Sequence, residues 1–213
     1  MQDLSLREKK FIKVKWALVD AFIERLKKTK FDQISIKDVC LEAEVSEATF
    51  YNYFPKKIDV IFNYLAAQIL KLKWKIHTDK KRNPIQKIDS IFESIANYLK
   101  QPYLLIEMVS AISQYKLHKK PLINLNSAEK RILCPDFPGI EDVSIVTIKE
   151  IIKDLIEEAK ISKLIISEIS SEDLSLVLHS ILVGTPFTLG ELGFKDLVEK
   201  YKLHLSIIWD RLT

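Results

Sequence analysis

Glycine and cysteine are scarce in this sequence, which has 4 Gly, 7 Pro and 2 Cys among 213 residues. So few turn-forming residues argue against a loop-rich β-protein and against a disordered chain. Cys40 and Cys134 have neither the number for a disulfide framework nor the spacing of a metal site, so we expect reduced thiols in a cytoplasmic protein. No apolar run approaches the roughly 18 residues of a membrane span and no signal-peptide pattern is present, so we expect no membrane segment.

The groups that an enzyme or a metal site needs are missing as well. No glycine-rich phosphate loop is present. The four histidines stand on separate segments, and none has a carboxylate or cysteine partner at ligand spacing: His77, His118, His179 and His204. We therefore expect no catalytic activity, no metal and no cofactor.

Positive charge is concentrated at the start of the chain. Residues 1 to 75 hold 15 Lys and Arg against 10 Asp and Glu, a net charge of +5, whereas the remainder holds 18 against 19, a net charge of −1. A basic segment on a nearly neutral body suits a polyanionic partner. The alternative interpretation is a lysine-rich helix face that is simply solvated.

Hydrophobic spacing predicts helices along the whole chain. The longer helical segments are residues 6 to 29, 56 to 75, 84 to 100, 102 to 116, 141 to 160, 171 to 190 and 194 to 212. Two short helices, 36 to 43 and 46 to 54, begin at the N-cap residues Ser35 and Ser46. Residues 117 to 140 carry three prolines and are interpreted as irregular. Since no strand alternation is convincing, the expected fold is all-α with about nine helices.

Residues 35 to 57, SIKDVCLEAEVSEATFYNYFPKK, have the pattern of a helix-turn-helix motif. Ser46 caps the second helix, and polar and small side chains at the start of that helix are not needed for a core. Lys37, Lys56 and Lys57 flank them. The N-terminus of a helix presents unpaired N–H groups, so such a helix suits base edges and phosphates.

This stretch resembles the DNA-binding domain of the TetR/AcrR family of transcriptional regulators. The matching residues are Ala43-Glu44-Val45-Ser46 in the turn, Ala48-Thr49-Phe50-Tyr51-Asn52-Tyr53-Phe54 in the recognition helix, and then Lys56-Lys57. Beyond about residue 75 the resemblance rests on the number and order of helices. It implies a helix-turn-helix DNA-binding domain over residues 1 to 56, a connecting helix over 56 to 75, and a helical ligand-binding and dimerisation domain over 57 to 213.

The resemblance also implies which residues contact DNA. They are the two serine caps, the exposed part of the recognition helix and the flanking lysines: Ser35, Lys37, Ser46, Glu47, Ala48, Thr49, Tyr51, Asn52, Lys56 and Lys57. Base choice in the family varies at the positions of Glu47 and Ala48, where a glutamate either accepts from a cytosine amino group or repels phosphate. Glu44 replaces the usual turn glycine, and a left-handed backbone there would cost about 1 kcal/mol.

Members of the family pair two such domains, so the resemblance implies a homodimer with recognition helices about 34–36 Å apart on palindromic double-stranded DNA. The last two helices are apolar on more than one side and supply the expected interface: Leu174, Val177, Leu178, Ile181, Gly184, Val198, Tyr201, Leu205, Ile208 and Trp209. Gly184 would let two backbones approach closely, and Pro186 should bend its helix. The alternative is that both helices belong to the core of a monomer.

The resemblance further implies a small-molecule effector in the C-terminal domain. A polar stripe on the helix 102 to 116 either lines a pocket or faces solvent: Tyr103, Glu107, Ser110 and Gln114. Five apolar or aromatic residues either form pocket walls or pack in the core: Trp74, Phe92, Tyr98, Met108 and Phe187. The apolar bulk of these helices favours a hydrophobic or amphipathic effector, such as a fatty acyl compound, over a highly charged one.

The sequence thus predicts a ligand-responsive DNA-binding transcriptional regulator, a repressor by the family's usual outcome. The alternative is an all-helical ligand-sensing or protein-interaction module that does not read DNA. The basic N-terminal third and the exposed-type residues Thr49, Tyr51 and Asn52 favour the regulator. A salt titration of DNA binding distinguishes the two hypotheses, since binding to DNA phosphates weakens steeply as the salt concentration rises.

Overall fold

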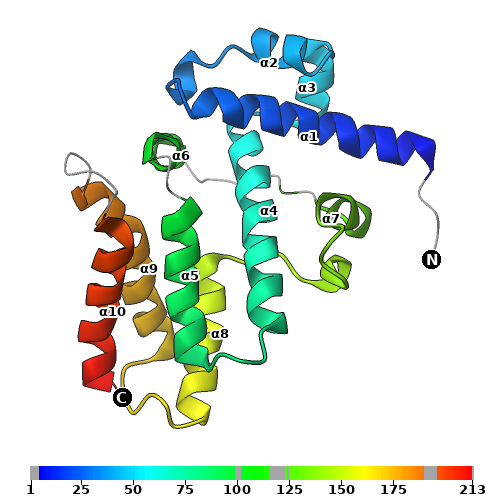
Figure 1. Ribbon diagram of the computed structural model, residues 1–213. Helices are drawn as coiled ribbons and strands as arrows, with labels where there is room; N and C mark the ends of the chain where they lie inside the picture. Colours follow the sequence, from blue (N-terminus) through cyan, green and yellow to red (C-terminus); the bar gives the residue numbers. More distant parts are fainter. Residues whose placement is uncertain (1–4, 99–101, 116–122, 124, 190–195, 213) are drawn as a thin grey trace. The chain divides into compact units, whose positions relative to one another are not determined.

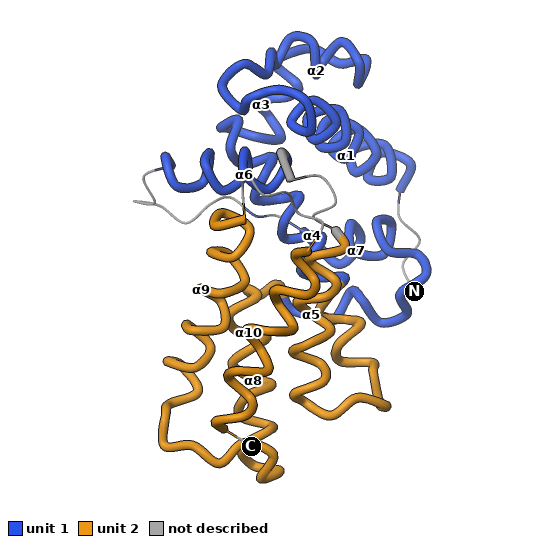
Figure 2. The backbone as a smooth tube through the Cα atoms, turned by 60° about the vertical axis from the view of Figure 1, so that its left-hand side comes forward, with its two compact units in different colours: residues 1–71, 103–144 blue, residues 72–102, 145–213 orange. Residues whose placement is uncertain are grey.

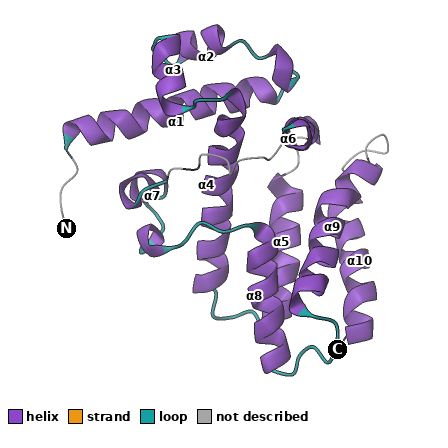
Figure 3. Ribbon diagram, turned by 180° about the vertical axis from the view of Figure 1, so that it is seen from behind, coloured by secondary structure: helices purple, strands orange, loops and turns teal. Residues whose placement is uncertain are grey.

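The computed structural model describes residues 5–98, 102–115, 123, 125–189 and 196–212. Within these residues the chain forms ten α-helices and two short 3-10 helices, and no strand (Figure 3). The expected all-α fold is confirmed. One helix more than expected is present, and it lies in the segment that the sequence predicts to be irregular.

The chain divides into two compact units, coloured separately in Figure 2. Unit 1 comprises residues 1–71 and 103–144, and unit 2 comprises residues 72–102 and 145–213. This division differs from the predicted boundary at residue 56, because residues 57–71 and the segment 103–144 pack with the N-terminal helices. The functional boundary at residue 56 therefore stays a prediction.

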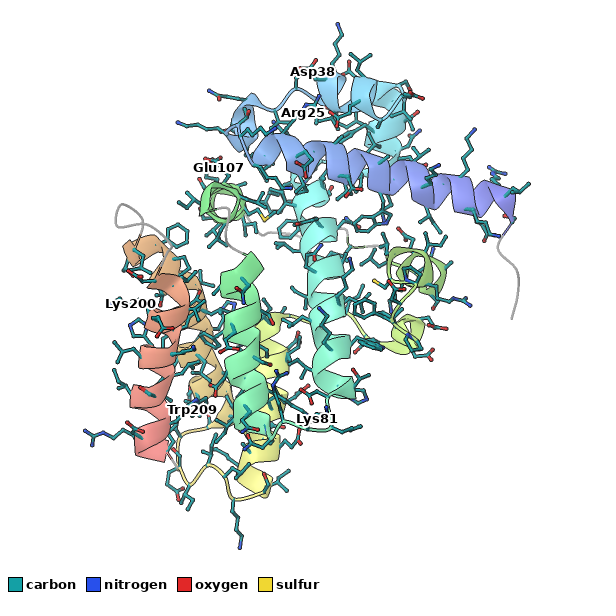
Figure 4. The ribbon with its side chains drawn as sticks, viewed as in Figure 1. Arg25, Asp38, Lys81, Glu107, Lys200 and Trp209 are labelled. Atoms are coloured by element: carbon teal, nitrogen blue, oxygen red, sulfur yellow. The ribbon has the colours of Figure 1, made fainter. Side chains whose placement is uncertain are left out.

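Unit 1 contains α1, α2, α3, most of α4, α6 and α7, with these bounds: α1 Leu6–Leu26, α2 Ile36–Glu42, α3 Glu47–Tyr53, α4 Lys57–Thr78, α6 Pro102–Gln114 and α7 Ser127–Leu133. α1 packs against α2 and α3. Its buried face includes Leu18, Phe22 and Leu26, spaced by four residues so that they lie on one side of the helix. Arg25 donates a hydrogen bond to the carbonyl of Asp38 at 3.1 Å, which ties the end of α1 to α2 (Figure 4).

α7 is the helix that the sequence interpretation missed. It begins at the N-cap Asn126, where the side chain accepts from the backbone of Glu129 and the Glu129 carboxylate accepts from the backbone of Asn126. Its buried side chains include Glu129 and Lys130, so no apolar periodicity reveals it. The next helix also begins later than expected, at Ile148, because Thr147 and Glu150 form another capping box.

Unit 2 contains α5, α8, α9 and α10, with these bounds: α5 Pro84–Tyr98, α8 Ile148–Ile161, α9 Ser171–Leu189 and α10 Leu197–Leu212. α8 packs on α5 and α9, and α10 packs on the same two helices (Figure 1). The Tyr201 ring meets the Phe92 ring edge-on at 5.0 Å, and the Tyr201 hydroxyl donates to the Leu182 carbonyl at 2.6 Å. This buried aromatic pair fixes α10 against α5 and α9.

Candidate DNA-binding surface

The turn between α2 and α3 has the geometry that the sequence led us to test. Glu44 has a φ of 55°, in the left-handed region. The Val45 amide donates to the Cys40 carbonyl at 2.9 Å and the Glu44 amide donates to the Leu41 carbonyl at 3.2 Å. These two bonds form a Schellman motif, in which glycine is the usual left-handed residue. The expectation of a strained, non-glycine turn residue is confirmed.

α3 is anchored on one side and open on the other. Phe50 and Phe54 are fully buried, with ring centroids 5.6 Å apart. The opposite side of the helix exposes four of the predicted contact residues, namely Glu47, Ala48, Tyr51 and Asn52. Because Phe50 fixes the rotation of α3, these side chains face away from the core of unit 1.

The start of α3 is capped by its own side chains. The Ser46 hydroxyl oxygen accepts from the Thr49 amide at 3.2 Å and lies 2.9 Å from the Thr49 hydroxyl. Thr49 is half-buried. Ser35 plays the corresponding part for α2, where it accepts from the Asp38 amide. Two of the predicted DNA contacts therefore also serve as helix caps.

The three predicted lysines differ in how firmly they are held. Lys37 is exposed on α2. The Lys56 ammonium donates to the Tyr115 hydroxyl at 3.0 Å, and this bond raises the pKa of Lys56. The Lys57 ammonium donates to the Asp32 carbonyl at 3.3 Å and lies 4.8 Å from the centre of the Phe31 ring, and burial lowers its pKa. Lys57 is thus part of the packing of unit 1 as well as a candidate phosphate contact.

Sequence reasoning overlooked the start of α1. Four exposed basic residues occupy its first turns, namely Arg7, Lys9, Lys10 and Lys13. The Phe11 ring lies 4.5 Å from the Tyr53 ring, so this part of α1 is beside α3. The net positive charge of residues 1 to 75 indicated a basic surface. It did not indicate which lysines lie near α3.

Part of the predicted effector set belongs to unit 1. Glu107, labelled in Figure 4, accepts from the Phe31 amide at 2.9 Å, so its carboxylate holds α6 to the short helix at 31–33. Met108 is buried, and the Gln114 amide donates to the Ser110 hydroxyl at 3.2 Å. The side chains of Tyr98 and Tyr103 lie outside the described residues.

The other predicted effector residues belong to unit 2. Trp74 is half-buried, Phe92 is fully buried and Phe187 is exposed. Phe92 also lines a cleft of about 250 Å³ between α5 and α10, together with Val198 and Trp209. The assignment of an effector pocket to these residues stays a prediction.

The predicted dimer residues separate into three groups. Four of them are buried in the core of unit 2, so their predicted place in a dimer interface is corrected. They are Leu174, Leu178, Tyr201 and Leu205. Four others line a groove of about 690 Å³ formed by α9 and α10: Val177, Ile181, Gly184 and Ile208. This face also exposes Leu176 and Ile207, which the prediction did not include. Val198 and Trp209 line the cleft between α5 and α10, where the Trp209 indole N–H donates to the Asp89 carboxylate at 3.0 Å.

Other kinds of site find no support in the described part of the chain. No group of His, Cys, Asp and Glu side chains there has an arrangement that could hold a metal ion. None of the helices described is long and apolar enough to cross a membrane.

Comparison with known proteins gives the fold a name. The structure superposes on the Thermus thermophilus TetR-family repressor FadR, solved with lauroyl-CoA, with a TM-score of 0.64 and 17% identity over 91% of this chain and 92% of that one. For the Bacillus subtilis regulator FadR, solved with stearoyl-CoA, the TM-score is 0.58 and the identity 18%, over 90% and 96% of the two chains. The chain has the fold of the TetR/AcrR family.

Sequence comparison adds a partial match to this TetR fold. The chain is 24% identical over 93 residues to the HTH-type transcriptional repressor KstR of Rhodococcus jostii, and the match spans 44% of each protein. No model of a known protein family matches the chain. The TetR fold is therefore established by structure, and the function has to be argued from the site.

Proposed function

We propose that this protein is a ligand-responsive transcriptional repressor that binds palindromic double-stranded DNA as a homodimer. The observation that carries the proposal is the orientation of α3. Buried Phe50 turns the helix so that Glu47, Tyr51 and Asn52 are exposed beside its capped N-terminus. A short, rigidly seated helix with polar side chains and a free face is what reading a major groove requires.

The roles of the individual residues follow from their chemistry. Glu47 and Ala48 lie in the first turn of α3 and are the candidates for base choice. Tyr51 and Asn52 donate hydrogen bonds suited to phosphate oxygens, and exposed Lys37 adds charge. The basic start of α1 extends this positive surface, since Phe11 holds that part of α1 against α3.

Pairing of two copies is supported by the free face of α9 and α10. Val177, Ile181 and Ile207 leave apolar side chains on the outer side of two packed helices. An apolar groove of about 690 Å³ on such a face is costly to leave in water, and a second copy of the chain would cover it. Two copies would place two recognition helices on successive major grooves.

For the effector we propose a hydrophobic compound of the fatty acyl class that enters the helical domain after residue 56. The support is the apolar composition of α6 and of α9, together with the acyl-CoA ligands named for the two FadR structures. Binding there would shift the dimer toward a form in which the two recognition helices no longer match successive grooves.

Fluorescence anisotropy with a labelled duplex of unselected sequence tests the DNA-binding proposal. Wild-type protein should bind at low salt and lose affinity steeply as salt rises. Lys37→Ala should reduce the magnitude of the salt slope by about 1, because one phosphate contact is lost. Tyr51→Phe should weaken binding without changing the slope, because it removes only a neutral hydroxyl.

Lys200→Ala is the matched control, since Lys200 is an exposed lysine on α10 in unit 2 (Figure 4). It should leave both the affinity and the slope unchanged. Absence of binding by the wild type at low salt would refute the proposal and leave a helical sensing or interaction module that does not read DNA.

A further inference from the structure

A second apolar groove runs along α1 within unit 1, and it includes Lys9 and Lys13 from the basic start of that helix. Its volume is about 550 Å³. Ile12, Trp16 and Ala17 of α1 form one side, and Ile132 and Leu133 of α7 form the other. This volume lies within the usual range of small-molecule sites, roughly 300–1,000 Å³.

The α7 side of the groove is held in place by a buried ion pair. The Lys15 ammonium donates to Glu129 Oε1 at 2.8 Å, and both side chains are almost fully buried, with 5% and 2% of their surface exposed. The Trp16 indole N–H donates to the same oxygen at 3.3 Å. Trp16 is therefore both a wall of the groove and a part of the joint between α1 and α7, so the groove is preformed.

Charges of opposite sign mark the two ends of the groove. Lys9 and Lys13 line one end and Asp20 lines the other. Asp20 follows Lys9 by eleven positions of α1, which corresponds to about 16 Å along the helix axis. Lys13 has no ion-pair partner within the part of the chain that the structure describes. Burial is the main cause that raises the pKa of Asp20.

We propose that this groove binds a single-chain amphiphile with one anionic head, namely a free carboxylate of medium chain length. The head lies between Lys9 and Lys13, and the chain runs over Trp16 toward Asp20, where a second acidic group would be repelled. A groove of about 16 Å accommodates an extended chain of roughly ten to twelve carbons. The site is separate from the proposed effector domain and does not depend on that proposal.

Quenching of tryptophan fluorescence by 7-bromoundecanoate tests the site, because bromine quenches an indole that it contacts, and a mid-chain bromine lies over Trp16 when the head is between Lys9 and Lys13. The chain has 3 Trp, so the double variant Trp74→Phe, Trp209→Phe leaves Trp16 as the reporter. Below the concentration at which the probe forms micelles, quenching of Trp16 should saturate. The uncharged 7-bromoundecanol has the same chain and should bind several-fold more weakly, because it lacks the charge that the lysines attract.

A charge reversal and its matched control locate the head group. Lys13→Glu should raise the Kd roughly fivefold, since an attraction at a partly solvated site becomes a repulsion. Lys10→Glu makes the same change on the same helix outside the groove and should change the Kd less than twofold. Ala17→Leu, which fills the groove without altering charge, should also weaken binding, with circular dichroism confirming that the variant is folded.

Four results would overturn the inference. The first is equal quenching by the carboxylate and the alcohol. The second is equal Kd values for the Lys13 and Lys10 variants. The third is a wild-type protein that binds the carboxylate in calorimetry while Trp16 remains unquenched, which would place the ligand elsewhere. Association with anionic vesicles without binding of the monomeric probe would likewise assign the groove to a membrane surface and contradict the proposal.

Discussion

The buried pair of Lys15 and Glu129 gives the sharpest prediction about stability. Glu129 accepts from the Lys15 ammonium at 2.8 Å, from the Trp16 indole at 3.3 Å and from the Asn126 amide at 3.3 Å. Removing one member of a buried ion pair leaves the other charge without compensation, at a cost of about 3–5 kcal/mol. Glu129→Gln and Lys15→Met should each lower the free energy of unfolding by that amount.

The double variant should lose much less than the sum of the single variants. With Lys15→Met and Glu129→Gln together neither charge of the pair remains, and the glutamine oxygen can still accept from Trp16. We expect it to lie within about 2 kcal/mol of the wild type, because replacing a whole buried pair is often close to neutral. The difference from additivity measures the coupling between the two side chains.

Urea unfolding followed by far-UV circular dichroism provides the measurement, with Trp16 fluorescence as a local probe. In a chain of this size each kcal/mol corresponds to about 2–4 °C in Tm, so the single variants should also melt roughly 6–20 °C lower. Single variants that each cost less than about 1 kcal/mol would refute the reasoning, since the pair would then be solvated and α7 would not be docked on α1 as described.

Three further predictions concern the turn, the proposed dimer face and a half-buried histidine. Glu44→Gly should raise Tm by about 2–4 °C by relieving a left-handed backbone, and Lys163→Gly, at a left-handed φ of 57° in the turn after α8, should do likewise; a fall in both melting temperatures would contradict this. Ile207→Asp should give monomers in analytical ultracentrifugation, whereas Ile161→Asp, an exposed isoleucine on α8, should leave the dimer intact. Burial lowers the pKa of His179, so its neutral form favours folding and wild-type stability should decline as pH falls below about 6.5; His179→Gln should flatten that decline in unfolding measured at pH values from about 7 to 5.

The helix-turn-helix could be predicted because its causes are local. Ser46 and Thr49 are three residues apart, and the Schellman bonds of the turn join Val45 to Cys40. Phe50 lies one turn from Phe54, so the spacing alone indicates which side of α3 is buried. The exposed face with Tyr51 and Asn52 follows from these short-range relations.

The predicted dimer face on α9 and α10 shows where spacing stops being informative. α9 and α10 carry apolar residues on more than one side, so the sequence by itself could not separate Leu174 from Leu176 or Leu205 from Ile207. The side of each helix that is buried depends on its neighbours, since α8 packs against α9 and α5 packs against α10. Leu174 and Leu205 are buried, whereas Leu176 and Ile207 are exposed. Burial depends on what lies opposite a helix, which its own periodicity does not record.

The sequence by itself determined the all-α fold and the helix-turn-helix, since helix caps, turn geometry and apolar spacing act over a few residues. Only the tertiary structure decided that α7 docks on α1, because Lys15 and Glu129 meet across 114 positions of sequence. In the sequence Lys15 is an ordinary charged residue of a predicted helix, and Glu129 lies in a segment predicted to be irregular. The buried ion pair forms only when α7 packs on α1, and the same packing forms the groove beside Trp16.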